Sequence, residues 1–260
     1  MRFHVLRSWA ILHHFPIDRP PEHAMRPLAF PSRHVVVAAL CAGLAGSNAF
    51  AQSRVHALDD AAAARVPAAE AVDDLGRALQ VGDIVFTRIG AYPFRKVADA
   101  TGTWTNHVGI VLDVSGDEPV IGESRFPFSG RTTLKRFVAR SAGGRVAVMR
   151  LPAPLSPDQQ AAIVAAAAQR DHVFYDTGFD ARSHRQFCSR YVREVLMEGA
   201  GVEVGRVETF QALLAAAPQS DVGFWRAWYF GSIPWQRETV TPASVLRTPG
   251  LQTVFDGTAA

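Results

Sequence analysis

Short runs of apolar residues, separated by turn-forming residues, predict a set of β-strands. Residues 81–86 read as a turn leading into a strand, because Gly and Asp precede three consecutive apolar side chains. Residues 106–112 and 119–123 predict two more strands, which the Ser-Gly-Asp turn at 115–117 joins as a hairpin. Residues 145–150 have the alternation of a further strand. The pattern therefore predicts an antiparallel sheet.

Two other segments have the pattern of helices. Phe94 and Val97 recur at helical spacing within residues 90–100. Ser156 is a preferred N-cap residue, and the proline after it and the glutamine three residues later favour a helix that runs to about Arg170. Strands and helices together indicate an α+β domain, in which an antiparallel sheet or small barrel packs against helices.

A third helix is predicted to begin near Cys188. Phe187, Tyr191, Val195 and Leu196 lie on one side of it, and two glycines end the apolar pattern. The helix dipole favours a thiolate over a thiol at this position. We therefore treat Cys188 as a candidate nucleophile, with a small, buried and unreactive cysteine as the alternative.

The segments on either side of these elements have a different composition. Residues 52–80 are rich in alanine and acids, which predicts a helical or flexible lead-in rather than a core element, docked through residues such as Leu75. Residues 223–235 are dense in aromatic side chains, which either fill a core or line a groove for a hydrophobic substrate. Residues 241–246 read as a capped terminal segment. We therefore expect one catalytic domain over residues 81–260.

Residues 1–51 are predicted to be upstream sequence and a secretory signal. From an internal start at Met25, the basic residues Arg26 and Arg33 precede the apolar run 35–44, and small residues surround a cleavage site after Ala51. A retained membrane anchor is the alternative, although the apolar run is short for a span. We expect a periplasmic or secreted protein with no stable membrane span after cleavage.

Removing this leader changes the charge and the cysteine count. The chain has 27 basic and 24 acidic residues, of which the leader carries five and two, so 22 of each remain. A mature protein without net charge gives no support to nucleic-acid binding. Cys41 leaves with the leader, and the bulky Leu40 before it does not fit a lipid-attachment site. Cys188 then lacks a partner for an internal disulfide.

A cysteine nucleophile needs a base, and four histidines follow the leader. His56 lies in the lead-in and His172 lies in a charged loop. His184 would share a helix face with the cysteine, which leaves no room for a substrate between them. His107 enters a predicted strand and is the best candidate, although a histidine that only satisfies a strand end is the alternative.

A catalytic histidine also needs a group that fixes its tautomer. Glu123 ends the strand predicted to pair with the strand of His107, and Gly122 leaves room for a close approach. A surface salt bridge between Glu123 and Arg125 is the alternative. The sequence contains no CxxC or HExxH motif and no glycine-rich phosphate loop, so we expect neither a metal nor another cofactor.

These motifs, in this order, resemble the circularly permuted papain-like proteins of the NlpC/P60 superfamily, especially the YaeF/YiiX type. In ordinary papain-like enzymes the cysteine helix precedes the histidine strand, whereas here the histidine comes first. The resemblance spans roughly residues 81–199. The motifs that carry it are Gly82–Phe86, Asn106–Val111, Gly122–Ser124 and Phe187–Ser189, with the Tyr175–Asp176 step before the cysteine.

The resemblance implies a permuted papain-like fold and assigns roles to its matching residues. It makes Cys188 the nucleophile, His107 the base and Glu123 the orienting residue, and Tyr175 lines the substrate site. We also assign two motif residues, Asp83 and Asn106, to substrate binding. The chain departs from many relatives at Arg190, where an acidic residue is expected, so the charge of the pocket and the substrate stay open.

The expected reaction is hydrolysis of an amide through a thioester intermediate. The substrate is expected to be a cell-wall peptide or a related amide. A lipid-directed acyl hydrolase or acyltransferase with the same residues is the first alternative, favoured by the aromatic-rich tail. A binding module that keeps the fold without turnover is the second. The oligomeric state stays open.

Overall fold

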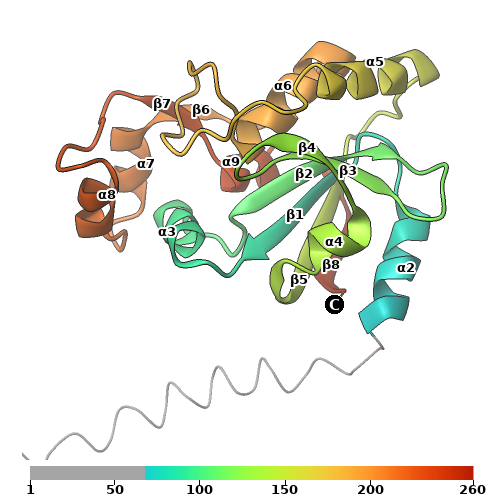
Figure 1. Cartoon of the computed structure of the whole chain (residues 1–260), viewed down its shortest axis with the longest axis horizontal. Helices are drawn as coiled ribbons and strands as arrows, with labels where there is room; N and C mark the ends of the chain where they lie inside the picture. The colour runs from blue at the N-terminus through green and yellow to red at the C-terminus, as the bar shows by residue number, and fades with distance from the viewer. Residues whose placement is uncertain (1–67, 260) are drawn as a thin grey trace, which may run out of the picture. The chain divides into compact units, whose positions relative to one another are not determined.

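Six antiparallel strands form the central sheet of the computed structural model, which describes residues 68–259 (Figure 1). Their order is β4-β3-β2-β1-β5-β8. A separate pair, β6 (Val207–Thr209) and β7 (Glu238–Val240), forms a small second sheet. The strands of the central sheet are β1 (Ile84–Ile89), β2 (His107–Asp113), β3 (Val120–Ser124), β4 (Ser129–Thr133), β5 (Ser141–Arg150) and β8 (Gln252–Thr258).

Several expectations concern residues outside the described part of the chain. These are the internal start at Met25, Cys41, the cleavage site after Ala51, His56 and the first part of the alanine-rich lead-in.

Both faces of the sheet are covered at its centre, which explains why the sequences of β1 and β2 are mostly buried and apolar. Alternate residues of β1 enter different clusters, with Ile84 and Phe86 on one side and Val85 on the other. Strand β2 alternates in the same way, so that Ile110 joins the first cluster and Val111 the second. Strands β1 and β2 therefore each contribute to both hydrophobic cores.

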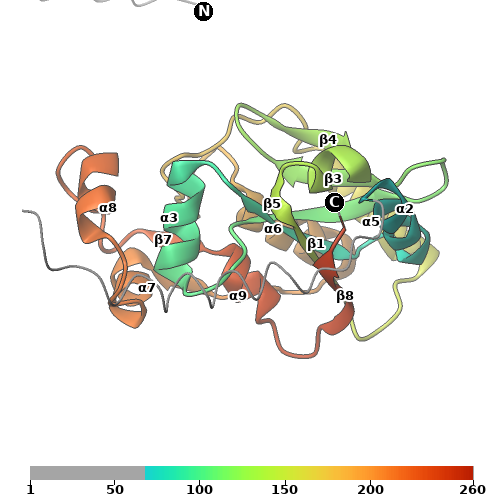
Figure 2. The same ribbon diagram turned by 90° about the horizontal axis from the view of Figure 1, so that it is seen from below.

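The helices divide between these cores. Side chains of α5 and α6 fill the first cluster, and those of α2 and α4 fill the second (Figures 1 and 2). Helices α3, α7 and α8 form a third group, in which Trp225 is buried. The helices are α2 (Ala68–Ala78), α3 (Tyr92–Thr101), α4 (Leu134–Val138), α5 (Pro157–Ala168), α6 (Cys188–Ala200), α7 (Phe210–Ala216), α8 (Val222–Trp228) and α9 (Pro242–Leu246).

Helix α6 is held close to its neighbours by glycine. A Cβ on Gly199 would lie 2.5 Å from the backbone nitrogen of Ile163, so only glycine allows α5 and α6 to pack this closely. Gly201 then ends the helix in the left-handed conformation, with φ of 69°. Cys188 is the first residue of this helix.

The structure confirms the expected hairpin of β2 and β3 and the expected helix after Ser156, whose capping box is present. It corrects two other expectations. Leu75 and Val72 of the lead-in are buried in the second core cluster, so α2 is a core element. Residues 241–246 do form a capped helix, but they are not the terminal element, because β8 follows and pairs with β5.

Among residues 68–259, no helix has both the length and the apolar character needed to cross a membrane.

Candidate active site

The candidate nucleophile lies where the start of α6 meets the sheet. Cys188 is a free thiol, and its residue is 4% exposed. Its helix packs against β2 and β3, where Gly122 makes room for it. A Cβ on Gly122 would lie 2.7 Å from the Tyr191 hydroxyl and 2.6 Å from Leu112. The glycine beside Glu123 therefore permits the close approach that the sequence suggested.

The expected base and orienting residue are in direct contact. His107 Nε2 lies 2.6 Å from Glu123 Oε2, and both side chains are almost fully buried. His107 is the first residue of β2, and Glu123 lies on β3, the neighbouring strand. His107 Nδ1 is buried and has no hydrogen-bond partner among the described residues, so it is the ring nitrogen that Glu123 does not engage.

His107 keeps a proton to high pH. Burial alone would lower its pKa, but the interactions with Cys188 and Glu123 outweigh burial and raise the pKa of His107 to about 9. The ring also packs against Phe137 of α4, with 5.4 Å between centroids.

Glu123 is ionised although it is buried. Burial alone would raise its pKa, but the hydrogen bonds and charges of His107 and Arg140 outweigh burial and hold the pKa of Glu123 below its usual value. Arg140 Nη2 donates to Glu123 Oε1 at 2.6 Å, and Arg125 Nε lies 3.4 Å from the same oxygen. The proposed surface pair of Glu123 and Arg125 thus exists beside the contact with His107, and does not replace it.

Tyr175 completes the immediate surroundings of the thiol. Burial, and then the charge and hydrogen bonding of Cys188, raise the pKa of Tyr175 well above its usual value. The phenol therefore stays protonated and can donate a hydrogen bond. Tyr175 precedes Asp176, whose carboxylate accepts hydrogen bonds from the backbone of Gly178 and Asp180 at 2.9 Å each.

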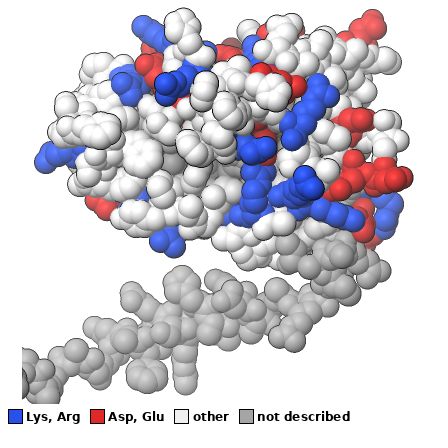
Figure 3. Space-filling model, viewed as in Figure 1, with Lys and Arg blue, Asp and Glu red and all other residues white. Residues whose placement is uncertain are grey.

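One apolar cavity adjoins Cys188, and a second apolar hollow shares part of its lining. The first is a cavity of about 30 Å³ lined by Cys188, Tyr175 and Phe187, among others. The second is an apolar groove of about 220 Å³ between α3 and α8. Figure 3 shows that the surface over these two helices is largely free of charged side chains. The hollows share five lining residues, namely Phe94, Val97, Tyr175, Phe179 and Trp225.

Two residues assigned to substrate binding have structural contacts instead. Asp83 lies at the opposite end of β1 from Thr87, which pairs with His107, and Arg150 binds both carboxylate oxygens of Asp83 at 2.7 Å. Asn106 lines the cavity beside Cys188. However, its side-chain oxygen accepts a hydrogen bond from the backbone nitrogen of Ile89, and its side-chain nitrogen donates to the carbonyls of Ile89 and Phe94. Asn106 therefore links the end of β1 to α3.

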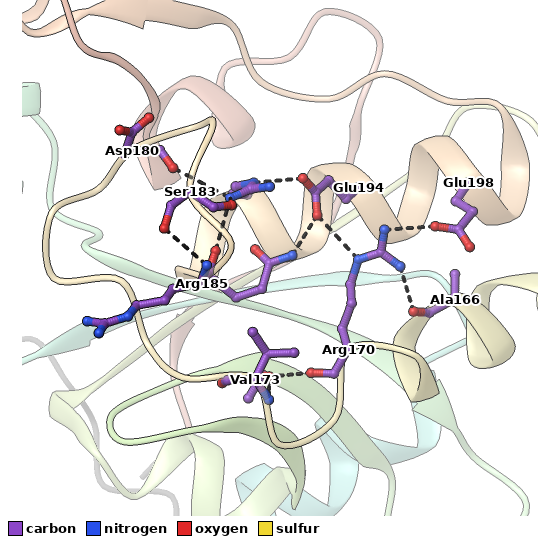
Figure 4. Close-up of polar contacts among 11 residues, drawn as sticks. Ala166, Arg170, Val173, Asp180, Ser183, Arg185, Glu194 and Glu198 are labelled. Carbon is purple, nitrogen blue, oxygen red and sulfur yellow. Dashed lines mark hydrogen bonds and ion pairs between the residues drawn. The ribbon is translucent and has the colours of Figure 1, made fainter. Parts of the chain in front are cut away.

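Arg190 is not among the residues that line the cavity beside Cys188. Its guanidinium donates to the carbonyls of Ser183 and Arg185 at 2.6 and 3.0 Å, and to Glu194 at 2.7 Å (Figure 4). Glu194 in turn accepts from Arg170 and Gln186. This network holds the loop 176–187, which leads from Tyr175 to Cys188.

The other described histidines lie outside the site. His184 and His172 are both exposed, and His172 has a positive φ of 63°. His184 precedes α6 rather than lying on it, so it does not share a helix face with Cys188.

Sequence reasoning missed Arg140 and Phe137, which contact Glu123 and His107. Both belong to the short segment 134–140, which carries no motif. A pattern search offers no signal for such contacts, since they depend on how α4 packs under the sheet.

Comparison with known proteins gives a family match over most of the chain. The family described as "Permuted papain-like amidase enzyme, YaeF/YiiX, C92 family" matches residues 78–255. Among solved structures, the chain is similar to yiiX from Escherichia coli O157:H7, described as a metalloprotein, with 26% identity and a TM-score of 0.60. The match covers 68% of this chain and 97% of that one. No curated protein matched the sequence.

The description of that neighbour raises the question of a metal site. In the part of the chain that the structure describes, no three His, Cys, Asp or Glu side chains are grouped so that they could hold a metal ion. Around Cys188 the structure places the His107 ring in contact with Glu123, and the phenol of Tyr175.

Proposed function

The chain belongs to the YaeF/YiiX family of permuted papain-like amidases and is therefore a papain-like cysteine hydrolase, and we propose that Cys188, His107 and Glu123 perform its reaction on an amide substrate. The observation that carries the proposal is the 2.6 Å contact between His107 and Glu123, made next to a buried free thiol. It supplies the base and the orienting group that a cysteine nucleophile requires.

In the first half of the reaction, the Cys188 thiolate attacks the carbonyl carbon of the amide. The carbonyl electrons move to oxygen, and the backbone amide of Cys188, which has no acceptor within its helix, donates to that oxygen. The neutral hydroxyl of Tyr175 is the second donor that we propose. His107 gives its proton to the leaving nitrogen, the C–N bond breaks, and an acyl thioester remains on Cys188.

In the second half, neutral His107 takes a proton from water, and the resulting hydroxide attacks the thioester. The C–S bond breaks, the carboxylic acid leaves, and the thiolate faces an imidazolium again. Glu123 holds one tautomer and one orientation of the ring through both halves. Glu123 stays ionised throughout, because His107 and Arg140 keep its pKa low.

The apolar groove between α3 and α8 favours a second candidate within the same chemistry. Its lining includes Phe126, Phe224 and Trp228, so it suits an apolar group next to the scissile carbonyl better than a charged peptide. A lipid-directed acyl hydrolase or acyltransferase is therefore the alternative to an amidase of cell-wall peptides. Export to the periplasm or the exterior remains part of the proposal and would bring the enzyme to either substrate.

A substrate panel separates these functions. Peptidoglycan stem peptides, N-acyl amides of short and long chain length, and acyl-lipid esters are incubated with the full chain and with Cys188→Ala. Cleavage of amides that depends on Cys188 supports the amidase, and turnover of esters alone supports the lipid-directed alternative. Binding to one of these compounds without any turnover would contradict both and leave a binding module.

A further inference from the structure

We infer that Arg140 is a positioning residue that keeps Glu123 ionised and oriented toward His107. This inference rests on the proposed function of Cys188, His107 and Glu123. Arg140 follows α4 and lies 17 positions after Glu123 in the sequence. It touches neither Cys188 nor the lining of the adjoining hollows, so it acts only through Glu123 and its neighbours.

The two carboxylate oxygens of Glu123 have different partners. Arg140 Nη2 donates to Oε1 at 2.6 Å, while Oε2 lies 2.6 Å from His107 Nε2. A carboxylate with only one oxygen anchored can rotate, whereas one held at both oxygens cannot. Because Arg140 occupies Oε1, the plane of the carboxylate is fixed and Oε2 stays aimed at the imidazole.

Arg140 is itself held in place by contacts with residues of α4. Its Nε donates to the carbonyl of Arg136 at 3.2 Å. Its guanidinium carbon lies 5.2 Å from the centre of the Phe137 ring, and that ring packs against His107. Phe137 is thus in contact with both side chains. A Cβ at position 109 would lie 2.9 Å from the Phe137 ring, so glycine is needed at this position to leave room for the ring.

The electrostatic role follows from burial. Glu123 has no exposed surface, and a buried carboxylate without a partner takes up a proton. The side chain of Arg140 is 35% exposed, so its charge is partly hydrated while it faces the buried anion. Figure 3 shows basic side chains gathered over the region of α4. The titratable and charged groups that act on Glu123 are His107, Arg125, Arg140, Tyr175 and Tyr191.

The test measures the alkylation of Cys188 by iodoacetamide as a function of pH, which needs no substrate. The full chain is compared with Arg140→Met, Arg140→Lys and Arg136→Met. Arg136 is exposed and lies on α4, the helix just before Arg140, and only its backbone takes part in these contacts. Arg136→Met therefore removes the same charge one turn away and leaves the hydrogen bond to its carbonyl intact.

We expect Arg140→Met to lose reactivity on the acidic side. Without the guanidinium, Glu123 takes up a proton at higher pH, which weakens its hold on the imidazolium. The rate at about pH 5.5 should fall by about tenfold, a shift of about one pH unit, with a smaller change at about pH 8. Arg140→Lys should lie between Arg140→Met and the unmodified chain, and Arg136→Met should match the unmodified chain.

The outcomes separate this inference from the proposed function. A pH profile of Arg140→Met that superimposes on that of the unmodified chain, or an equal shift in Arg136→Met, would overturn the role of Arg140 alone. A thiol in the unmodified chain that reacts no faster than a small free thiol would overturn the proposed function. If Arg140→Met does not fold, Arg140→Lys decides: an intermediate profile supports the inference and an unchanged profile contradicts it.

Discussion

A buried histidine normally loses its proton easily, and His107 behaves in the opposite way because its neighbours can both carry negative charge. Glu123 and Cys188 outweigh the desolvation of the ring and raise its pKa to about 9. Glu123 also accepts a hydrogen bond from Arg140, so its two carboxylate oxygens contact two basic side chains. Arg140 is thereby linked to His107 through Glu123.

The protonation of His107 couples the pH to the stability of the fold. Its pKa of about 9 in the folded chain lies above the value of about 6.5 in an unfolded one. The stabilisation that protonated His107 gives to the folded chain is therefore complete below about pH 6.5, and it is lost as the pH rises through about 9. We expect urea unfolding to show a loss on the order of 3 kcal/mol over this range in the unmodified chain.

The matched variants for this measurement are His107→Gln and His184→Gln. His107→Gln should lack this part of the pH dependence, whereas His184→Gln should keep it because His184 is exposed. Parallel pH dependences in all three proteins would show that His107 does not keep its proton in the folded state.

The residues of the site differ in how far sequence could identify them. Cys188, His107 and Glu123 stand at the start of a helix, the start of a strand and the end of a strand, and local patterns predict such positions. Asp83 was misassigned, because β1 runs antiparallel to β2 and carries Asp83 away from His107. Arg140 was missed, because its contact with Glu123 depends on how α4 packs and not on a motif.

At the scale of elements, the site depends on the close packing of α6 on β3. Gly122 lies under this helix, and a Cβ there would meet Leu112 at 2.6 Å and the Tyr191 hydroxyl at 2.7 Å. Both of these side chains are buried, so neither can move aside easily.

We expect Gly122→Ala to lower the free energy of unfolding by about 1–3 kcal/mol, as overpacking does in other cores. It should also reduce activity, since α6 and Glu123 would be pushed apart. Gly130 on β4 is the control, because nothing lies within 4 Å of a Cβ at that position. Equal melting temperatures of Gly122→Ala and Gly130→Ala would argue against tight packing at Gly122.

The loop 176–187 is the second element on which the site depends. Arg190 bonds three of its carbonyls, those of Asp180, Ser183 and Arg185, and Glu194 links Arg190 to Arg170 and Gln186. Arg190→Met should therefore increase amide hydrogen exchange in this loop by about tenfold, the equivalent of one charge-assisted hydrogen bond. Arg185→Met serves as the control, because the side chain of Arg185 is exposed and only its carbonyl is used. Unchanged exchange in Arg190→Met would mean that the loop is held by other contacts.

At the scale of the whole molecule, the chain order and the sheet order together explain the permuted arrangement. The strands of His107 and Glu123 are neighbours in the sheet and come before the cysteine helix in the sequence. Sequence patterning predicted these strands and the helix that begins at Cys188. It did not predict β4, β8 or the short elements β6, β7 and α7. Strands β4 and β8 are the two edges of the sheet, and their sequences are more polar because one side is open.

The aromatic tail shows a similar limit of sequence reasoning. We weighed a core against a groove, and the tail forms both: Trp225 is buried in the third core cluster and also lines the groove beside α3, together with the partly buried Phe224 and Trp228. Composition alone cannot separate these roles, because the same side chains of α8 take part in the core cluster and in the groove.

The central claim is that Cys188 forms a covalent acyl intermediate with the help of His107. An activated p-nitrophenyl ester is mixed with the full chain, with His107→Ala and with Cys188→Ala, and the products are followed by intact mass and peptide mapping. We predict one acyl group on Cys188 of the unmodified chain, acylation at least about tenfold slower in His107→Ala, and none at this position in Cys188→Ala. Acylation of another residue, or equal rates with and without His107, would contradict the account.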